Sequence, residues 1–152
     1  MTRWLTVCLI VFVSSLSLAE KPDTESELVA LPKKVKAPKD NPTTKAKVEL
    51  GKKLFFDSRL SGDNNMSCAT CHMPDKAYGD GLALSSGAGG KLLERNTQTC
   101  LNVGFFTTFF WDGRSPSLEQ QALGPIQSTV EMNQDLDELE TELAAIPGYV
   151  TE

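Results

Sequence analysis

The stretch Cys68-Ala69-Thr70-Cys71-His72 decides the fold of this chain. Two cysteines separated by two residues and followed at once by a histidine form the attachment sequence of a c-type haem. The two thiols can add across the vinyl groups of a haem, and the adjacent imidazole then binds the iron as its proximal ligand. His72 is also the only histidine in the sequence, so no second histidine of this chain can occupy the other face of the iron.

Two other uses of paired cysteines compete with this interpretation. A redox pair of the thioredoxin type lies in a βαβ pattern, and the sequence shows no such pattern around Cys68. A zinc site needs four ligands, usually from two clusters of cysteine or histidine, and only Cys100 remains downstream of the motif. The immediate histidine therefore favours a haem over a redox disulfide or a zinc ion.

The first 19 residues have the composition of an export signal. Arg3 gives a basic start, an apolar run covers residues 4–13, and small residues precede Ala19. This order predicts a secretory signal peptide over residues 1–19, cleaved after Ala19, and therefore a periplasmic protein. The apolar run is shorter than the roughly 20 residues of a membrane span, so no stable membrane span is expected.

Charge and cysteine usage narrow the class of partner. The chain of 152 residues carries a formal charge of −5 and has no basic stripe, so nucleic acid is not an expected partner. A small basic or dipolar electron carrier suits such a chain better. Cys8 leaves with the signal peptide and two cysteines belong to the motif, which leaves Cys100 alone. We expect this thiol to be buried in the packing.

The segment before the motif predicts a tether followed by a helix. Residues 20–42 are rich in Lys, Pro, Glu and Asp, with prolines at positions 22, 32, 38 and 42, which is typical of an extended segment. Within residues 43–56, apolar side chains recur every four positions. This spacing predicts an amphipathic helix that buries Leu50, Leu54 and Phe55.

An aromatic segment follows the motif. Residues 105–111 contain four phenylalanines and Trp111. Large aromatic side chains form ordinary protein core, and they are equally suited to enclose a haem, which is itself a large apolar plate. The sequence leaves both alternatives open.

Two further helices are predicted beyond the aromatic segment. Ser115 and the proline after it predict a helix over residues 116–123 that stops before Gly124-Pro125. Asn133 is the predicted cap of a second helix. The apolar stripe of that helix consists of Leu136, Leu139, Leu143 and Ile146. No alternating strand pattern occurs in the sequence, so the predicted fold is all-α and of the cytochrome c kind.

Seven segments together resemble the N-terminal haem domain of the bacterial di-haem cytochrome c peroxidases, a family that includes the methylamine-utilisation di-haem enzymes. They are Leu50-Gly51-Lys52-Lys53-Leu54-Phe55-Phe56-Asp57, the haem motif, Arg95-Asn96-Thr97, Phe110-Trp111-Asp112-Gly113-Arg114, Gln120-Gln121-Ala122-Leu123-Gly124-Pro125-Ile126, Val130-Glu131-Met132-Asn133 and Ile146-Pro147-Gly148-Tyr149-Val150. The resemblance covers residues 43–152, which we expect to form one haem domain.

The resemblance implies a role for several residues of this chain. His72 corresponds to the proximal ligand of a peroxide-reacting haem, which Cys68 and Cys71 attach, and Glu131 to the distal acid–base carboxylate. The other matching positions are Gln121 and Pro125 in the distal pocket, Trp111 towards the electron-transfer path, and Asn96 at a calcium site between two haem domains.

The sequence departs from the family pattern at two points. Many members carry a histidine that caps the resting iron, whereas this chain has Ala88 between two glycines, which implies an iron that is five-coordinate or water-bound at rest. The second haem domain of the family is also absent from this sequence. The alternatives are a truncated gene product, half of a split protein with a separate second-haem domain, and a single-haem variant.

The sequence thus predicts one covalent haem c and, by resemblance, possible calcium. It predicts an oxidoreductase that reduces hydrogen peroxide to water with electrons from a cytochrome c or a cupredoxin-like protein. The alternatives are a mono-haem electron-transfer cytochrome in which His72 and Met132 are the axial ligands, and a non-catalytic fragment.

Overall fold

The computed structural model describes residues 29–150. The chain divides into two compact units, Met1–Ala30 and Leu31–Glu152, and the described helices and the haem motif all belong to the second. The predicted signal peptide and the first part of the predicted tether lie outside the described residues. Within the described range, no helix is long and apolar enough to cross a membrane.

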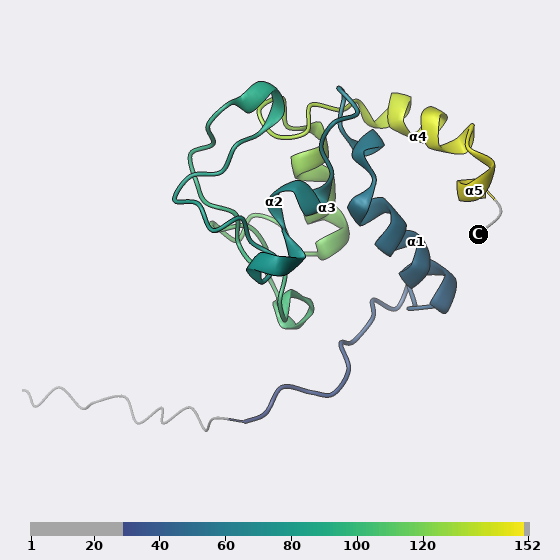
Figure 1. The fold of residues 1–152 in the computed structure, drawn as a ribbon. Coiled ribbons are helices and arrows are strands. Elements are labelled where there is room, and N and C mark those ends of the chain that lie inside the picture. The colour runs from purple at the N-terminus through teal and green to yellow at the C-terminus, as the bar shows by residue number, and fades with distance from the viewer. Residues whose placement is uncertain (1–28, 151–152) are drawn as a thin grey trace, which may run out of the picture. The chain divides into compact units, whose positions relative to one another are not determined.

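The second unit is built from helices joined by long loops (Figure 1). Its helices are α1 (Lys45–Phe56), α2 (Cys68–Cys71), α3 (Leu118–Gln127), α4 (Leu136–Ala144) and α5 (Pro147–Val150), with 3₁₀ turns at Ser58–Leu60, Pro74–Lys76, Ala88–Gly90 and Val103–Phe105. Over residues 29–150 the only β-type pairings are three isolated bridges. The prediction of an all-α chain is therefore confirmed for this range.

Helix α1 matches the predicted helix, although it begins at Lys45. Thr44 is its N-cap, and the Thr44 hydroxyl accepts a hydrogen bond of 3.2 Å from the main-chain nitrogen of Lys47. The prediction that Leu50, Leu54 and Phe55 would be buried is wrong, since α1 contains no fully buried residue and these three are half-buried.

Two predicted helix caps are wrong by two residues. Helix α3 is capped by Ser117, because the main chain of Ser115 instead pairs with that of Phe109. Helix α4 is capped by Asp135, whose carboxylate accepts hydrogen bonds from two main-chain nitrogens, whereas Asn133 adopts a left-handed φ of 50°. A left-handed residue breaks the extended approach that an N-cap requires.

The predicted end of α3 is also wrong. Pro125 lies inside the helix, which continues to Gln127. The main-chain oxygens of Pro125 and Ile126 accept hydrogen bonds of 3.1 and 2.9 Å from the nitrogens of Met132 and Gln134. These bonds hold the last turn in place although proline removes one donor from the helix.

The hydrophobic core joins α1, α3 and α4. Its fully buried members are Leu60, Met132 and Leu139, and the partly buried side chains around them are Leu54, Ile126, Leu136 and Leu143. Three of the four residues of the predicted α4 stripe are therefore in the core, and Ile146 is half-buried outside this cluster.

Residues 31–42 contain no helix or strand, yet they contact the rest of the unit. Both methyl groups of Val35 face Gly104, and a Cβ added to that glycine would lie 2.9 and 3.2 Å from them. The Asn41 amide donates a hydrogen bond of 3.1 Å to the Glu119 carboxylate of α3. The sequence prediction of an extended tether did not include these contacts.

A carboxylate links the end of α1 to α5. Asp57 accepts hydrogen bonds from the Arg59 side chain, including one of 2.8 Å from Nε, and from the Tyr149 hydroxyl. The Arg59 guanidinium, opposed by burial and helped by the Tyr149 hydroxyl, holds the pKa of Asp57 far below its ordinary range. Asp57 is therefore ionised at every pH at which an ordinary aspartate, with a pKa of about 3.9, is ionised.

We expect this carboxylate to make the protein sensitive to acid. Because the pKa of Asp57 is lower in the folded than in the unfolded state, its contribution to stability is complete above about pH 4 and falls as pH decreases below that value. Asp57→Asn should lower the free energy of unfolding by about 1.5 kcal/mol at pH 7, and this difference should shrink near pH 3. Denaturant unfolding at both pH values measures it, with Asp63→Asn as the exposed-carboxylate control. A difference independent of pH would contradict this assignment.

Candidate haem site

The short helix α2 presents the residues of the haem motif. The main-chain nitrogen of Ser67 donates a hydrogen bond of 2.9 Å to the Thr70 hydroxyl, which fixes the start of the helix. The main-chain nitrogen of His72 donates one of 2.9 Å to the carbonyl of Cys68. Residues three apart on a helix lie on one face, so Cys68 and Cys71 are on the same side of α2.

The His72 ring is oriented by a main-chain carbonyl. Its Nδ1 lies 3.1 Å from the carbonyl oxygen of Tyr78. Because a carbonyl can only accept, this contact assigns the proton to Nδ1 and leaves the lone pair on Nε2. The Phe55 ring of α1 packs near it, with ring centroids 6.4 Å apart. His72 thus has the tautomer and support of a metal-binding histidine.

An unusual turn aims the Tyr78 carbonyl. Ala77 and Tyr78 both have left-handed φ values, 54° and 57°, which non-glycine residues adopt rarely. The turn is closed by a hydrogen bond of 2.8 Å from the Tyr78 nitrogen to the Met73 carbonyl. The backbone strain is therefore located where the chain reaches back to His72.

The cysteines of this region are free thiols. Cys68, Cys71 and Cys100 are all half-buried, so the prediction that Cys100 would be buried is wrong in degree. Burial raises the pKa of all three thiols, and the next cause that raises it is Cys71 for Cys68, Asp80 for Cys71 and Cys68 for Cys100. Cys68 and Cys71 are thus held as thiols at neutral pH.

One loop connects the motif to Glu131. The Cys71 thiol is 3.8 Å from the Ser86 carbonyl oxygen, and the main-chain nitrogen of Ala88 donates a hydrogen bond of 2.7 Å to the Glu131 carbonyl. Between them, Gly87 packs so closely that an added Cβ would lie 2.9 Å from the carbonyl carbon of Val130 and overlap its oxygen. Cys71 and the half-buried Glu131 therefore both lie against this loop.

Helix α3 carries two other predicted site residues beside the Glu131 segment. Gln121 and Pro125 are one turn apart on α3, and both are half-buried. The carbonyl of Pro125 accepts the hydrogen bond from the nitrogen of Met132, the residue after Glu131. Met132 itself is 6% exposed and packs in the core, which argues against Met132 as an iron ligand.

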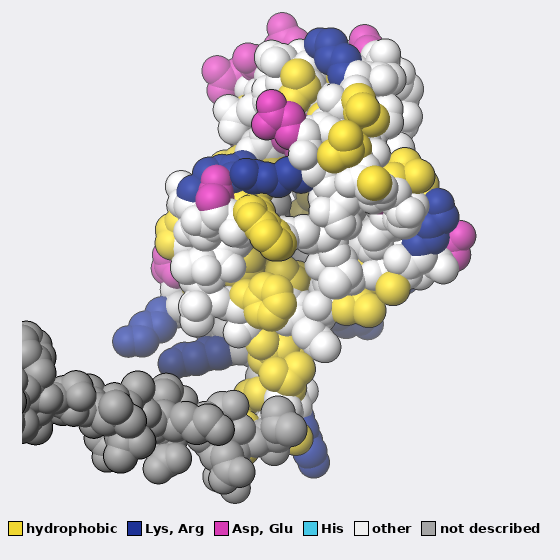
Figure 2. Space-filling view, turned by 90° about the vertical axis from the view of Figure 1, so that its left-hand side faces the viewer, with side chains coloured by type: hydrophobic (Ala, Val, Ile, Leu, Met, Phe, Trp, Pro, Cys, Tyr) yellow, Lys and Arg dark blue, Asp and Glu magenta, His cyan; other side chains and the backbone are white. Residues whose placement is uncertain are grey.

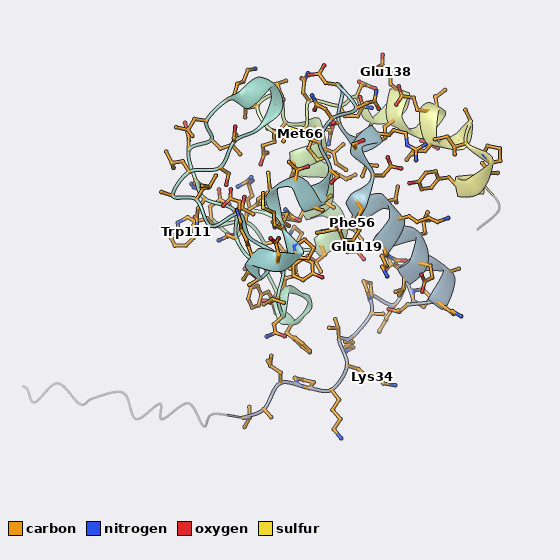
Figure 3. All side chains as sticks on the ribbon, viewed as in Figure 1. Lys34, Phe56, Met66, Trp111, Glu119 and Glu138 are labelled. Carbon is orange, nitrogen blue, oxygen red and sulfur yellow. The ribbon has the colours of Figure 1, made fainter. Side chains whose placement is uncertain are left out.

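The aromatic segment divides between core and surface. Phe109 is buried, and the Phe110 ring packs against Gly124 of α3. Trp111 is 76% exposed and projects outward from the loops (Figure 3). Phe106 is exposed as well, and apolar side chains form a band along one face of the molecule (Figure 2). Trp111 is therefore not grouped with Glu131.

In the described part of the chain, side chains do not cluster into the zinc site or the calcium site that the sequence analysis considered. Asn96 is exposed. Within residues 29–150, no three His, Cys, Asp or Glu side chains are grouped as a metal ion would require. The donor set of α2, which consists of two free thiols on one face and an imidazole with an available Nε2, does fit a covalently bound haem.

Sequence reasoning missed three contributors to this site. Tyr78 acts through its main-chain oxygen, which no side-chain pattern reveals. Phe55 was predicted as core and instead lies beside His72. Asp80 is only 4% exposed, and its position between Gly79 and Gly81 was the available signal.

Comparison with known proteins finds a matching family and several similar proteins. A family model described as di-haem cytochrome c peroxidase matches residues 45–152. The methylamine utilization protein MauG of Methylorubrum extorquens is 44% identical over 142 residues, which cover 90% of this chain and 40% of that protein. The cytochrome c551 peroxidase of Pseudomonas aeruginosa is 42% identical over 120 residues, which cover 79% and 35%.

Solved structures show the same relationship. A MauG-like protein associated with microbial copper homeostasis superposes with a TM-score of 0.73 at 32% identity, over 80% of this chain and 37% of that one. The diheme peroxidase BthA of Burkholderia thailandensis gives 0.66 at 27% identity, over 72% and 32%. The chain spans no more than about two fifths of the length of these relatives.

Proposed function

Because the chain belongs to the di-haem cytochrome c peroxidase family, we propose that it carries one covalent haem c and reduces hydrogen peroxide to water. The observation that supports this most directly is the loop from Ser86 to Ala88, which joins the Cys71 thiol to the Glu131 main chain. It brings a haem-linking cysteine and the main chain of an acidic residue against one loop. The haem domain, residues 43–152, has a cytochrome c-like fold in this proposal.

The residues of the motif bind and orient the cofactor. Cys68 and Cys71 form thioethers, and His72 offers Nε2 to the iron while the Tyr78 carbonyl holds Nδ1. When bound, the haem supplies an iron centre that exchanges electrons with peroxide. Ala88 has no donor side chain, so this residue would supply no ligand to the iron.

Glu131 moves the proton. Its carboxylate takes a proton from one oxygen of hydrogen peroxide and gives a proton to the other oxygen, which leaves as water. Two electrons from the donor and two protons complete the conversion of one peroxide to two waters. Gln121 and Pro125, beside the Glu131 segment on α3, border the peroxide and limit access of bulk water.

Electrons reach the site from a partner. Trp111 is exposed, and we assign it to the path of electron entry. The donor is a cytochrome c or a cupredoxin-like protein, acting directly or through a separate second-haem domain. Asn96 contributes to a calcium site only where such a domain supplies the other ligands. Export by a signal peptide over residues 1–19, followed by a tether to residue 42, places these partners in the periplasm.

Haem attachment and peroxide reactivity test this function together. We expect the full chain, produced with a c-type maturation system, to retain haem on a denaturing gel, and Cys71→Ala to lose most of this signal. Because the second face of the iron is open, the ferric protein should be high-spin and bind cyanide. Peroxide should then drive oxidation of a reduced cytochrome c. A colourless chain would contradict the cofactor, and a haem-bearing chain without this oxidation would contradict the activity.

A further inference from the structure

A buried carboxylate lies close to the haem motif. Asp80 is 4% exposed and follows the turn that presents the Tyr78 carbonyl to His72. Its Oδ1 accepts a hydrogen bond of 2.9 Å from the main-chain nitrogen of Leu82, and its Oδ2 accepts one of 3.2 Å from the Thr97 hydroxyl. Aspartate is seldom so deeply buried without a specific role or partner.

The hydrogen-bond donors to the Asp80 carboxylate oxygens are uncharged groups. The Thr97 hydroxyl is 2.7 Å from the hydroxyl of Ser85, which is 1% exposed. Lys76 donates to the main-chain oxygen of Asp80 at 2.9 Å, and its side chain lies at the surface. Burial acts to raise the pKa of Asp80, but hydrogen bonds from Ser85, Leu82 and Thr97 outweigh it and keep this pKa below its ordinary value. The carboxylate is therefore charged at neutral pH.

The charge is close enough to act on the haem-linking sulfur. After burial, Asp80 is the largest cause that raises the pKa of the Cys71 thiol, ahead of Glu131. The main-chain nitrogen of Met73, the residue after His72, donates a hydrogen bond of 3.0 Å to the carbonyl of Gly79, the residue before Asp80. The loop that contains Asp80 is thus held against the end of the haem motif.

We propose that Asp80 is a positioning residue that holds a fixed negative charge beside the haem motif and would stabilise the oxidised iron over the reduced iron. The inference rests on the haem attachment proposed above. The oxidised iron carries one more positive charge, so a nearby carboxylate favours it. Electron transfer from the iron to peroxide becomes more favourable for the same reason.

The test is a redox titration of the full-length holoprotein. Asp80→Asn removes the charge with little change of shape, and Asp75→Asn removes an exposed charge from the same loop as a control. At a fixed applied potential, the ferrous-to-ferric ratio of Asp80→Asn should exceed that of Asp75→Asn by about tenfold, the order of magnitude expected when one buried unit charge near the iron is removed at an effective dielectric constant near 20. Circular dichroism and the absorbance of bound haem confirm that each variant is folded and loaded.

A second variant serves if Asp80→Asn does not fold. Lys76→Gln removes the cation beside Asp80 from the surface, and it should lower the ferrous-to-ferric ratio by about twofold relative to Lys45→Gln, since exposed charges are screened. Equal ferrous-to-ferric ratios for Asp80→Asn and Asp75→Asn would overturn the role of Asp80 and leave the proposed function untouched. If the first pair is not obtained, equal ratios for Lys76→Gln and Lys45→Gln would have the same meaning. A wild-type chain without covalent haem would overturn the proposed function and this inference with it.

Discussion

Glu131→Gln should slow peroxide reduction by about 10²–10⁴-fold while haem attachment stays intact, because an amide cannot exchange a proton with peroxide as a carboxylate does. Glu131 is half-buried, and its main chain is fixed by hydrogen bonds to Ala88 and Ser128. The substitution preserves size and leaves these main-chain bonds in place. Peroxide-dependent oxidation of a reduced cytochrome c, followed by stopped-flow absorbance, measures the effect.

A matched control separates the loss of proton transfer from the loss of charge. Glu138 lies on the exposed side of α4, far from Trp111 in Figure 3, and Glu138→Gln removes the same charge there. We expect its turnover to be within twofold of the wild-type chain, since exposed charges have small effects. Equal rates for Glu131→Gln and Glu138→Gln would remove Glu131 from the mechanism.

Gly87→Ala should destabilise the protein and disrupt the haem site. The added Cβ would lie 2.9 Å from the carbonyl carbon of Val130 and 3.0 Å from the Cα of Glu131, and both are backbone atoms that a side-chain rotation cannot move. Overpacking of this kind costs about 1–3 kcal/mol. Relief requires the loop to separate from Glu131, so we expect the free energy of unfolding and the peroxide rate to fall together.

Gly51→Ala is the matched control for this change. Gly51 lies in α1 with no atom within 4 Å of an added Cβ, and alanine is favoured over glycine in a helix by about 1 kcal/mol. This variant should therefore unfold at a higher denaturant concentration than the wild-type chain and keep its peroxide rate. If Gly87→Ala behaved like Gly51→Ala, the close approach of the loop to Val130 would be ruled out.

The sequence predicts the existence and position of helix α1 better than the ends of α3 and α4. The haem motif and the helix over α1 depend on local spacing, and both are found where expected. The predicted caps of α3 and α4 are wrong because a residue that could cap a helix precedes each true cap by two positions. Ser115 precedes the true cap Ser117, and Asn133 precedes the true cap Asp135. For α3, the main chain of Ser115 pairs with that of Phe109, and the Ser115 hydroxyl donates to the Ser117 carbonyl at 3.0 Å, so Ser117 is left to cap the helix.

Features that depend on the main chain or on distant pairing were not predictable. Pro125 reads as a helix stop, yet bonds from residues 132 and 134 extend α3 beyond it. Asp80 lies among glycines in a loop, and its burial depends on Thr97, which is 17 residues away. Gln121 and Pro125, which lie on α3 beside the Glu131 segment, share no sequence pattern with it, and they were found through resemblance to a family.

The hydrogen bond that orients His72 comes from the peptide unit of Tyr78. Replacement of the tyrosine side chain leaves that oxygen in the chain, so this hydrogen bond does not depend on the chemical nature of the side chain at position 78. The constraints on that side chain are instead its contact with Phe55, with ring centroids 6.2 Å apart, and the left-handed φ of 57°. Only changes that unwind the turn itself, such as an insertion between Met73 and Gly79, would release the imidazole.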